Sequence, residues 1–332
     1  MNISVLDQSP ISEGSTGADA LRNTLDLARL ADDFGYARYW VAEHHGTPML
    51  ACASPEVMIA AIGSITRRMR IGSGGVMLPH YSPFKVAETF SILSALFPGR
   101  VDLGIGRAPG TDHTTAFALQ RDRRQPAPDD FPQQLAELLG YLENRVPPGH
   151  PFARLAALPG GRCVPEVWLL GSSPQSALWA AETGLPYAFA YFINPEGAAY
   201  AAIYRDRFCA SESLARPRVM VAGFAICADT DEEAERIASS ARMTRALLNQ
   251  GHLIPVPPID KALRFLAERG PRPDSAVRPR RAIVGSPATV RKGIEELAAL
   301  YLADEVMIVT ITFDHAARRR SYELIAEAFR SR

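Results

Sequence analysis

The chain has 332 residues, of which 47% are hydrophobic and 22% are charged. Its 36 basic and 36 acidic residues balance, and no basic run is longer than Arg318–Arg320, which argues against nucleic acid or a membrane surface as the main partner. No stretch reaches the roughly 18 apolar residues of a transmembrane helix, and no leader pattern opens the chain. The four cysteines are widely spaced, so we expect a cytoplasmic protein with reduced thiols.

Six Ser-Pro or Asn-Pro pairs stand where an apolar, β-rich run gives way to a helical pattern. They are Ser9-Pro10, Ser54-Pro55, Ser82-Pro83, Ser173-Pro174, Asn194-Pro195 and Ser286-Pro287. Ser and Asn cap the free amides of a first helical turn, and Pro fits the first helical position. The recurrence predicts repeated strand–turn–helix units. Functional sites in such folds lie at the carboxyl ends of the strands.

Hydrophobic periodicity predicts eight strands and seven bounded helices along the chain. The predicted strands are 2–7, 38–42, 69–78, 101–106, 165–170, 187–192, 219–227 and 305–312. The predicted helices are 18–34, 55–65, 83–97, 132–142, 174–183, 231–248 and 316–329. Eight such units favour a closed (β/α)8 TIM barrel, one domain over residues 1–332, above an open doubly wound sheet.

A barrel of this kind needs about 250 residues, so the remainder must be insertions. Two stretches rich in Pro and Gly, near 145–162 and 250–281, lack clean periodicity. The second lies between the seventh and eighth predicted strands, and we interpret it as a mobile, irregular lid over the site.

Glu43-His44-His45 directly follows the second predicted strand. A histidine there could move a proton near neutral pH. The alternative is a pair of loop histidines that bind backbone carbonyls. No third ligand has diagnostic spacing, so we predict no metal site.

Two strand ends are candidates for binding phosphate. Arg107 lies in a glycine-lined end, GIGRAPG, whose spacing does not match a dinucleotide fingerprint. Its guanidinium could neutralise a phosphate or pair with a nearby Asp. After Gly171 come Ser172, Ser173 and Ser176 at a helix start, where amides and hydroxyls converge. The alternative there is simple N-capping by Ser173.

Gly74-Gly75 interrupts an apolar strand. Glycine in a strand marks a bulge, a flat ligand against the backbone, or tight packing at a barrel corner. The sequence alone leaves these three interpretations open.

Taken together, EHHG, SGGVMLPHYSP, DLGIGRAPG and GSSPQSALWAAETGLP, followed by VGSPATVRKGIEEL and DEVMIVTITFDHAARRRSYEL, resemble the bacterial luciferase-like flavin monooxygenases. The resemblance spans nearly the whole chain and implies a (β/α)8 barrel that binds FMN at its strand ends. It also implies that His44 is the catalytic histidine and that a non-prolyl cis peptide joins Gly74 and Gly75. The implied cofactor-binding residues are Glu43, His45, Gly74, Gly75, Arg107, Ser172, Ser173, Ser176 and Tyr191. Gly106 replaces the reactive Cys of true luciferase α chains, so we do not expect light emission. Ser172 replaces their Glu, so we expect the phosphate contacts to differ in detail.

The resemblance implies an FMN-dependent monooxygenase in which O2 adds at the flavin 4a carbon and a small aldehyde or other carbonyl compound is oxidised. A separate NAD(P)H-dependent flavin reductase would supply reduced FMN. The alternatives are a deazaflavin-dependent hydride-transfer enzyme and a non-catalytic flavin-binding protein. We also expect a homodimer through helices 55–65 and 83–97. Apolar residues expected to lie off their core-facing stripes are Met58, Ile62, Phe84, Ile92 and Leu96.

Overall fold

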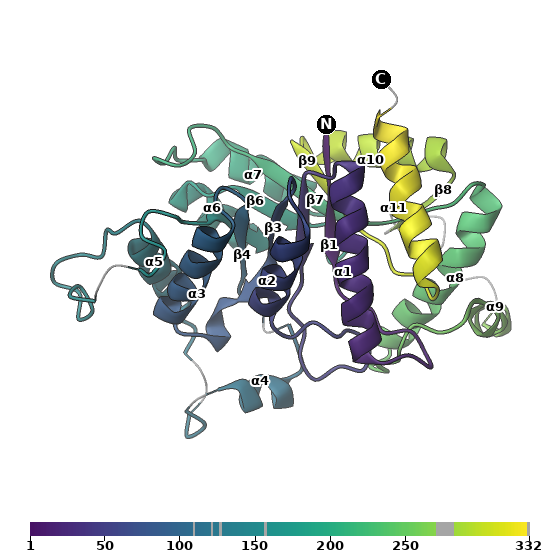
Figure 1. Cartoon of the computed structure of the whole chain (residues 1–332), viewed down its shortest axis with the longest axis horizontal. Coiled ribbons are helices and arrows are strands. Elements are labelled where there is room, and N and C mark those ends of the chain that lie inside the picture. The colour runs from purple at the N-terminus through teal and green to yellow at the C-terminus, as the bar shows by residue number, and fades with distance from the viewer. Residues whose placement is uncertain (109, 121, 126–127, 156–157, 270–281, 331–332) are drawn as a thin grey trace.

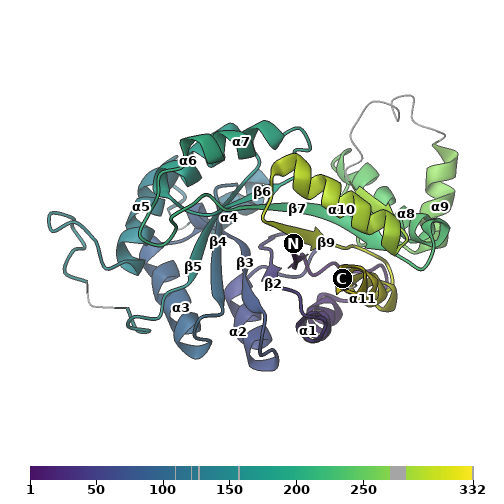
Figure 2. The same ribbon diagram turned by 90° about the horizontal axis from the view of Figure 1, so that it is seen from above.

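The computed structural model describes residues 1–108, 110–120, 122–125, 128–155, 158–269 and 282–330. In these residues nine parallel strands form one sheet surrounded by helices (Figures 1 and 2). The strands are β1 (Asn2–Asp7), β2 (Arg38–Val41), β3 (Arg70–Met77), β4 (Val101–Gly106), β5 (Glu166–Gly171), β6 (Tyr187–Ala190), β7 (Val219–Cys227), β8 (Ala282–Gly285) and β9 (Glu305–Val309). Eight of them close a barrel, because β6 also pairs with β7, while β8 pairs with β7 beside it. The predicted (β/α)8 barrel is confirmed.

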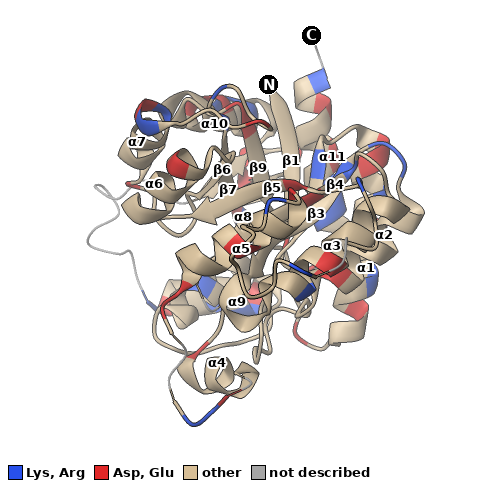
Figure 3. Ribbon diagram, turned by 90° about the vertical axis from the view of Figure 1, so that its left-hand side faces the viewer, with Lys and Arg blue, Asp and Glu red and all other residues tan. Residues whose placement is uncertain are grey.

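The helices pack around the outside of the barrel. They are α1 (Gly17–Phe34), α2 (Pro55–Ile65), α3 (Pro83–Leu96), α4 (His113–Leu119), α5 (Phe131–Leu142), α6 (Pro174–Thr183), α7 (Ala198–Arg207), α8 (Asp231–Leu248), α9 (Ile259–Glu268), α10 (Pro287–Tyr301) and α11 (His315–Arg330), with a short 3-10 turn at Leu78–His80. Among the described residues, no helix is both long and apolar enough to cross a membrane. On the face seen in Figure 3, acidic and basic residues are interspersed along the helices.

Four of the six Ser/Asn-Pro pairs open a helix, with Pro in its first turn: α2, α3, α6 and α10. The serine before each of these prolines was predicted to cap the helix with its side chain. Of the four serines, Ser173 alone does so. The other two pairs were wrongly predicted to start helices. Ser9 has φ 50° and α1 begins after Thr16, while α7 begins after Gly197. In the four turns that do begin a helix, proline fits the first turn whether or not the preceding side chain caps it, because its ring fixes φ.

The prediction of an irregular segment at 250–281 is wrong over its described part. Helix α9 forms within it and packs against α8. Val256 makes backbone hydrogen bonds of 2.8 Å with Ile11 and Glu13, in the loop after β1. Residues 270–281 lie outside the described part of the chain. The stretch between α5 and β5, which contains the other predicted insertion, consists of turns where it is described.

All barrel strands run parallel, so their amino ends meet at one rim, the base, and their carboxyl ends at the other, the mouth. The barrel interior is apolar in the middle, with Trp40 and Trp168 edge to face at 5.6 Å between ring centroids. Its buried residues are Leu6, Trp40, Ala42, Trp168, Ala188, Met220, Ala222, Met307 and Val309. A larger apolar layer lies between the strands and the helices.

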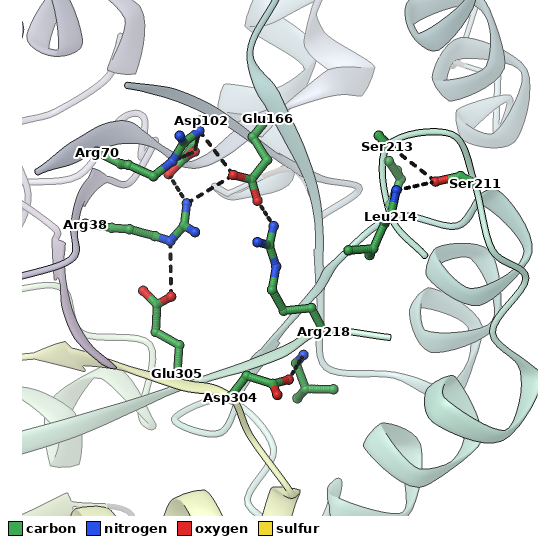
Figure 4. A network of polar contacts seen from close by, with 12 residues as sticks. Arg38, Arg70, Asp102, Glu166, Ser211, Ser213, Leu214, Arg218, Asp304 and Glu305 are labelled. Carbon is green, nitrogen blue, oxygen red and sulfur yellow. Dashed lines mark hydrogen bonds and ion pairs between the residues drawn. The ribbon is translucent and has the colours of Figure 1, made fainter. Parts of the chain in front are cut away.

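Six charged side chains close the base (Figure 4). They are Arg38, Arg70, Arg218, Asp102, Glu166 and Glu305. Arg38 lies 2.7 Å from Asp102 and 3.2 Å from Glu305, and Arg218 pairs with Glu166. Three positive charges thus meet three negative ones. Arg38, Asp102 and Glu305 are buried and need such partners, whereas the other three side chains are partly exposed. This ion-pair network holds the base together, whereas most of the candidate residues predicted from the sequence follow the carboxyl ends of the strands at the mouth.

Candidate functional site at the mouth of the barrel

The loop after β2 carries Glu43, His44 and His45, and Glu43 fixes this loop to β3. One Glu43 oxygen accepts a 2.9 Å hydrogen bond from the Tyr81 hydroxyl and lies 2.7 Å from His45 Nε2. The other accepts a 3.0 Å hydrogen bond from the Met77 amide. Glu43 is 1% exposed, so protein donors occupy its carboxylate. It is therefore suited to holding the histidines in place rather than to touching a ligand.

His44, like His45, is partly buried. Its backbone amide donates to the carbonyl of Cys52 at 3.0 Å, and its Nδ1 is buried without a partner among the described residues. Burial, and then the neighbouring His45, lower the pKa of His44 to about 4. The imidazole is therefore neutral near pH 7 and able to accept a proton. A buried polar atom without a partner is costly, and a ligand that bonds it would recover that cost.

The loop after β4 packs onto the same histidines. The Thr111 hydroxyl donates to the carbonyl of His45 at 2.9 Å. A Cβ on Gly46 would come within 2.5 Å of Thr115 Oγ1 in α4, and a Cβ on Gly110 within 3.0 Å of the Glu43 carbonyl. These close approaches place α4 and the loop that begins at Arg107 at the mouth, where α4 stands clear of the barrel (Figure 1).

The peptide bond between Gly74 and Gly75 is cis, as the resemblance implied. The register between β3 and β4 shifts between Gly74 and Val76, so the strand is locally irregular. A Cβ on Gly75 would lie 2.8 Å from the Gly104 carbonyl oxygen and 3.1 Å from Leu170. The glycines thus serve close packing of β3 against β4. Since Val41 of β2 pairs with Ser73 of β3, this stretch also lies next to the histidine loop.

The phosphate candidates come together at α6. Arg107 follows β4, its side chain is 53% exposed, and its guanidinium lies over the Trp179 ring of α6 at 5.6 Å. Its nearest described acid is Asp129, at 3.9 Å. At the start of the same helix, Ser173 accepts from the Ser176 amide as the N-cap. Arg107 thus contacts α6 at Trp179, the same helix whose first turn carries the serines, and the capping alternative for Ser173 is present.

The three serines differ in what they can offer a ligand. Ser176 is 7% exposed, and its hydroxyl lies 2.8 Å from the Ser173 carbonyl and 2.9 Å from the Tyr187 hydroxyl. Ser173 is exposed and Ser172 partly so. Ser176 is therefore occupied inside the protein, which leaves Ser172 and Ser173 at the surface of the turn.

Tyr191 does not face the barrel interior. It is 8% exposed and packs edge to face with Tyr301 of α10, at 5.9 Å between ring centroids. The neighbouring Phe192 packs against the interior cluster instead, 5.4 Å from Phe224. The alternation of side chains along a strand indicates this arrangement of Tyr191 and Phe192. In YAFAYF, Tyr191 shares a face with Tyr187 and Phe189, whereas Phe192 shares the other face with the two alanines.

A layer of apolar side chains therefore lines the mouth. Four partly buried residues pack onto the interior cluster, and they come from β5, the end of β6, β7 and the end of β9. They are Leu170, Phe192, Phe224 and Ile311. None of these four positions was predicted from the sequence to belong to the site. Beside it lie a neutral histidine, a glycine-rich strand and a basic helix start, which together suit a flat, partly apolar group that carries a phosphate.

A family model for luciferase-like monooxygenases matches residues 1–304. The uncharacterized protein YwcH of Bacillus subtilis (strain 168) is 44% identical over 331 residues, covering 99% of both chains. The N-acetyl-S-alkylcysteine monooxygenase of the same organism is 37% identical over 330 residues, 99% of this chain and 98% of that protein. The chain therefore belongs to the luciferase-like monooxygenase family and is an oxidoreductase.

Solved structures agree with this assignment. The structure of apo-MsnO8 superposes with a TM-score of 0.89 at 41% identity, covering 99% of this chain and 98% of that one. More distant neighbours share the fold alone. They include the oxygenating component of 3,6-diketocamphane monooxygenase of Pseudomonas putida in complex with FMN (TM-score 0.75, 21% identity) and an F420-dependent secondary alcohol dehydrogenase (TM-score 0.66, 14% identity).

Proposed function

We propose that the whole chain acts as one barrel domain that binds reduced FMN and uses O2 to oxidise a small organic substrate. A separate NAD(P)H-dependent reductase would supply the reduced flavin. The observation that carries this proposal is His44, a neutral imidazole whose buried Nδ1 lacks a described partner, in a loop fixed to the Gly74–Gly75 strand. The FMN complex of a structural neighbour supports the choice of cofactor.

The residues at the mouth fit FMN. Arg107 would pair with its phosphate, and the amides and hydroxyls of Ser172 and Ser173 would bind the same group at the positive end of α6. The backbone around Gly75 presents no side chain, which suits a flat ring. His44 would hold or accept a proton at Nδ1, and Glu43 would keep the histidine loop in register with β3.

Reduced flavin supplies the two electrons of the reaction, so that one oxygen atom of O2 enters the substrate and the other leaves as water. The protein contributes position and exclusion of water. The apolar layer of Leu170, Phe192, Phe224 and Ile311 would surround the reacting groups. Because His44 is neutral in the resting protein, it could take up a proton during the reaction, and the resting site would hold no buried charge at this histidine.

Two substrate classes are reasonable. A carbonyl compound oxidised in the Baeyer–Villiger manner follows the Pseudomonas putida neighbour, which is 21% identical. An N-acetylated, S-alkylated cysteine follows the Bacillus subtilis relative, which is 37% identical over nearly the whole chain. The higher identity makes the cysteine derivative the first compound to test.

Oxygen uptake tests the proposal. Purified protein is given FMN, a flavin reductase and NADH, and uptake and product are measured with a panel of S-alkylated cysteines and ketones. We expect product from at least one compound. His44→Asn should lower product formation by about 100-fold while FMN affinity stays within a few-fold. Binding of deazaflavin in place of FMN, or tight FMN binding without product from any compound, would favour one of the two alternatives.

We further propose a homodimer through α2 and α3, on a smaller set of residues than the sequence indicated. Met58 and Ile62 were wrongly assigned to the surface, since they are 8% and 1% exposed and belong to the core. Ile92 and Leu96 of α3 are 45% and 61% exposed, and Val57 of α2 is 64% exposed. Exposed apolar side chains on two adjacent helices support a subunit contact.

A further inference from the structure

A cavity of about 420 Å³ lies at the base of the barrel, at the opposite end from the candidate site. Its walls come from the amino ends of β3, β4 and β5, from the segments that lead into β6 and β7, and from the end of α5. The volume is within the range of roughly 300–1,000 Å³ that is typical of small-molecule sites. Apolar side chains make up much of the lining, among them Leu139, Leu142, Val164, Val167, Leu185 and Leu214.

The loop before β7 forms one wall of this cavity and is held in place by its own hydrogen bonds. The Ser211 hydroxyl donates to the carbonyl of Gly184 at 2.9 Å and accepts from the Leu214 amide at 3.1 Å (Figure 4). The Ser211 amide in turn donates to the Leu214 carbonyl at 3.0 Å. The wall that carries Leu214 is therefore formed before any ligand arrives, which lowers the cost of binding.

Two arginines line the cavity, and they differ in how fully their donors are used. Arg70 donates to Asp102 at 2.7 Å and to two backbone carbonyls. The side chain of Arg218 forms a single ion pair within the described residues, with Glu166 (Figure 4). Its Nε is buried and has no hydrogen-bond partner among those residues. Arg218 is thus the cation of this cavity whose pairing is incomplete, which is costly for a buried donor.

The acids nearby do not complete the pairing of Arg218. Glu166 is shared, since it also lies 3.1 Å from Arg70 and 3.6 Å from Arg38. Glu143, the other acid in the lining, pairs with an arginine outside the cavity at 2.6 Å. Burial, and then the Arg38 guanidinium, lower the pKa of Arg218. The Arg218 side chain is 33% exposed, so a negatively charged group in the cavity could reach it and stabilise its charge.

We propose that the cavity at the base binds a small molecule with an aliphatic body and a carboxylate. The aliphatic body would lie on the leucine and valine side chains of the lining, with the carboxylate against the Arg218 guanidinium. That guanidinium also stacks over the Trp168 ring, with its Cζ 4.5 Å from the centroid, and Trp168 packs on Trp40 in the barrel interior. The ligand would therefore bind beneath the interior of the barrel, at a site separate from the mouth and independent of FMN.

The test compares a carboxylate with its uncharged amide. Binding of octanoate and of octanamide to the full chain is measured by calorimetry, with and without an excess of FMN. We expect octanoate to bind roughly 10- to 100-fold more tightly than octanamide, the usual range for a charge-assisted bond. FMN should not change this preference, because the mouth and the base are opposite ends of the barrel. Arg218→Gln should reduce the preference to less than about threefold.

Arg207→Gln is the matched control, because Arg207 lies at the end of α7, is 71% exposed and is absent from the cavity lining. It should keep the wild-type preference. A second variant leaves the charges unchanged: Val164→Trp, at a residue that is 46% exposed, should fill part of the cavity and weaken the binding of both compounds by about tenfold or more. No binding of octanoate, equal binding of both compounds, a preference retained in Arg218→Gln, unchanged binding in Val164→Trp or displacement of octanoate by FMN would overturn the proposal.

Discussion

His44 links pH to the stability of the fold. Its pKa is lowered to about 4 in the native state, whereas an unfolded histidine titrates near 6.5. Between these values the unfolded chain binds more protons, so the free energy of unfolding falls as the pH is lowered. A shift of this size corresponds to roughly 3 kcal/mol, all of it lost by about pH 4.

Urea unfolding of wild type and His44→Asn, measured between about pH 4.5 and 7, checks this prediction. The variant should lose the part of the pH dependence that belongs to His44. His113→Asn, an exposed control at the start of α4, should behave as the wild type. Parallel pH profiles for wild type and His44→Asn would show that burial of His44 does not control its charge.

Arg107→Ala should weaken FMN binding by about 10- to 100-fold, because a charge-assisted contact with phosphate is worth roughly 1.5–3 kcal/mol. The ion pair between Arg107 and Asp129 is long and exposed and therefore weak, so it competes little with the phosphate for the guanidinium. Riboflavin, which lacks the phosphate, should bind the variant and the wild type equally. Fluorescence titration with both ligands gives the answer, and Arg124→Ala, which alters an exposed arginine paired with Asp122, is the control. Equal losses for FMN and riboflavin would mean that Arg107 acts on the ring or on the fold.

Much of the candidate site could be predicted at the level of single residues, since Glu43, His44, Arg107 and Ser173 are marked by motif and by position after a strand. What could not be predicted is which of these side-chain atoms already have hydrogen-bond partners within the protein. The Ser176 hydroxyl bonds to Tyr187, eleven residues away on another element, and such long-range partners leave no local signal. Arg218 and Trp168 likewise come together from separate elements.

At the scale of elements, β3 and β4 approach each other closely at their glycines. A Cβ on Gly104 would meet the Ser73 carbonyl oxygen and would lie 2.8 Å from Leu170 Cδ1. Gly104→Ala should therefore destabilise the fold by about 1–3 kcal/mol or more, as overpacking does. Gly149→Ala is a suitable control, because nothing lies within 4 Å of a Cβ there. Chemical denaturation of both variants tests this, and equal midpoints would mean that the strands can separate without cost.

Element bounds were predicted best where proline or glycine fixes an end, as in α2 and α6. The failures have a common cause. The prolines around α9 hid a ten-residue amphipathic helix, and β8 has four residues that pair with β7 alone. Short elements stabilised by tertiary contacts carry too little periodicity to be seen in the sequence.

At the scale of the whole molecule, Leu96→Asp should convert the proposed dimer into a monomer, because a charge at the centre of an apolar contact would lose its water. Light scattering at micromolar concentration measures this. Leu300→Asp, at a residue of α10 that is 58% exposed, should leave the assembly unchanged. A monomeric wild-type chain would end the proposal. Ile62→Asp cannot serve as a probe, because that side chain lies in the core and its replacement would unfold the protein.

Strand β7 exchanges one neighbour for another at Phe224. Up to that residue it is bonded to β9, and from that residue on to β8. The excursion between β7 and α10 is thus attached to the barrel along β7 and, through Val256, at the loop after β1, whereas the closure of the barrel by β6, β7 and β9 does not depend on β8. Evolution, or a protein engineer, could exchange this excursion for that of a relative as a cassette. Such a chimera should keep the barrel closed, because none of the strand pairs that close it would change.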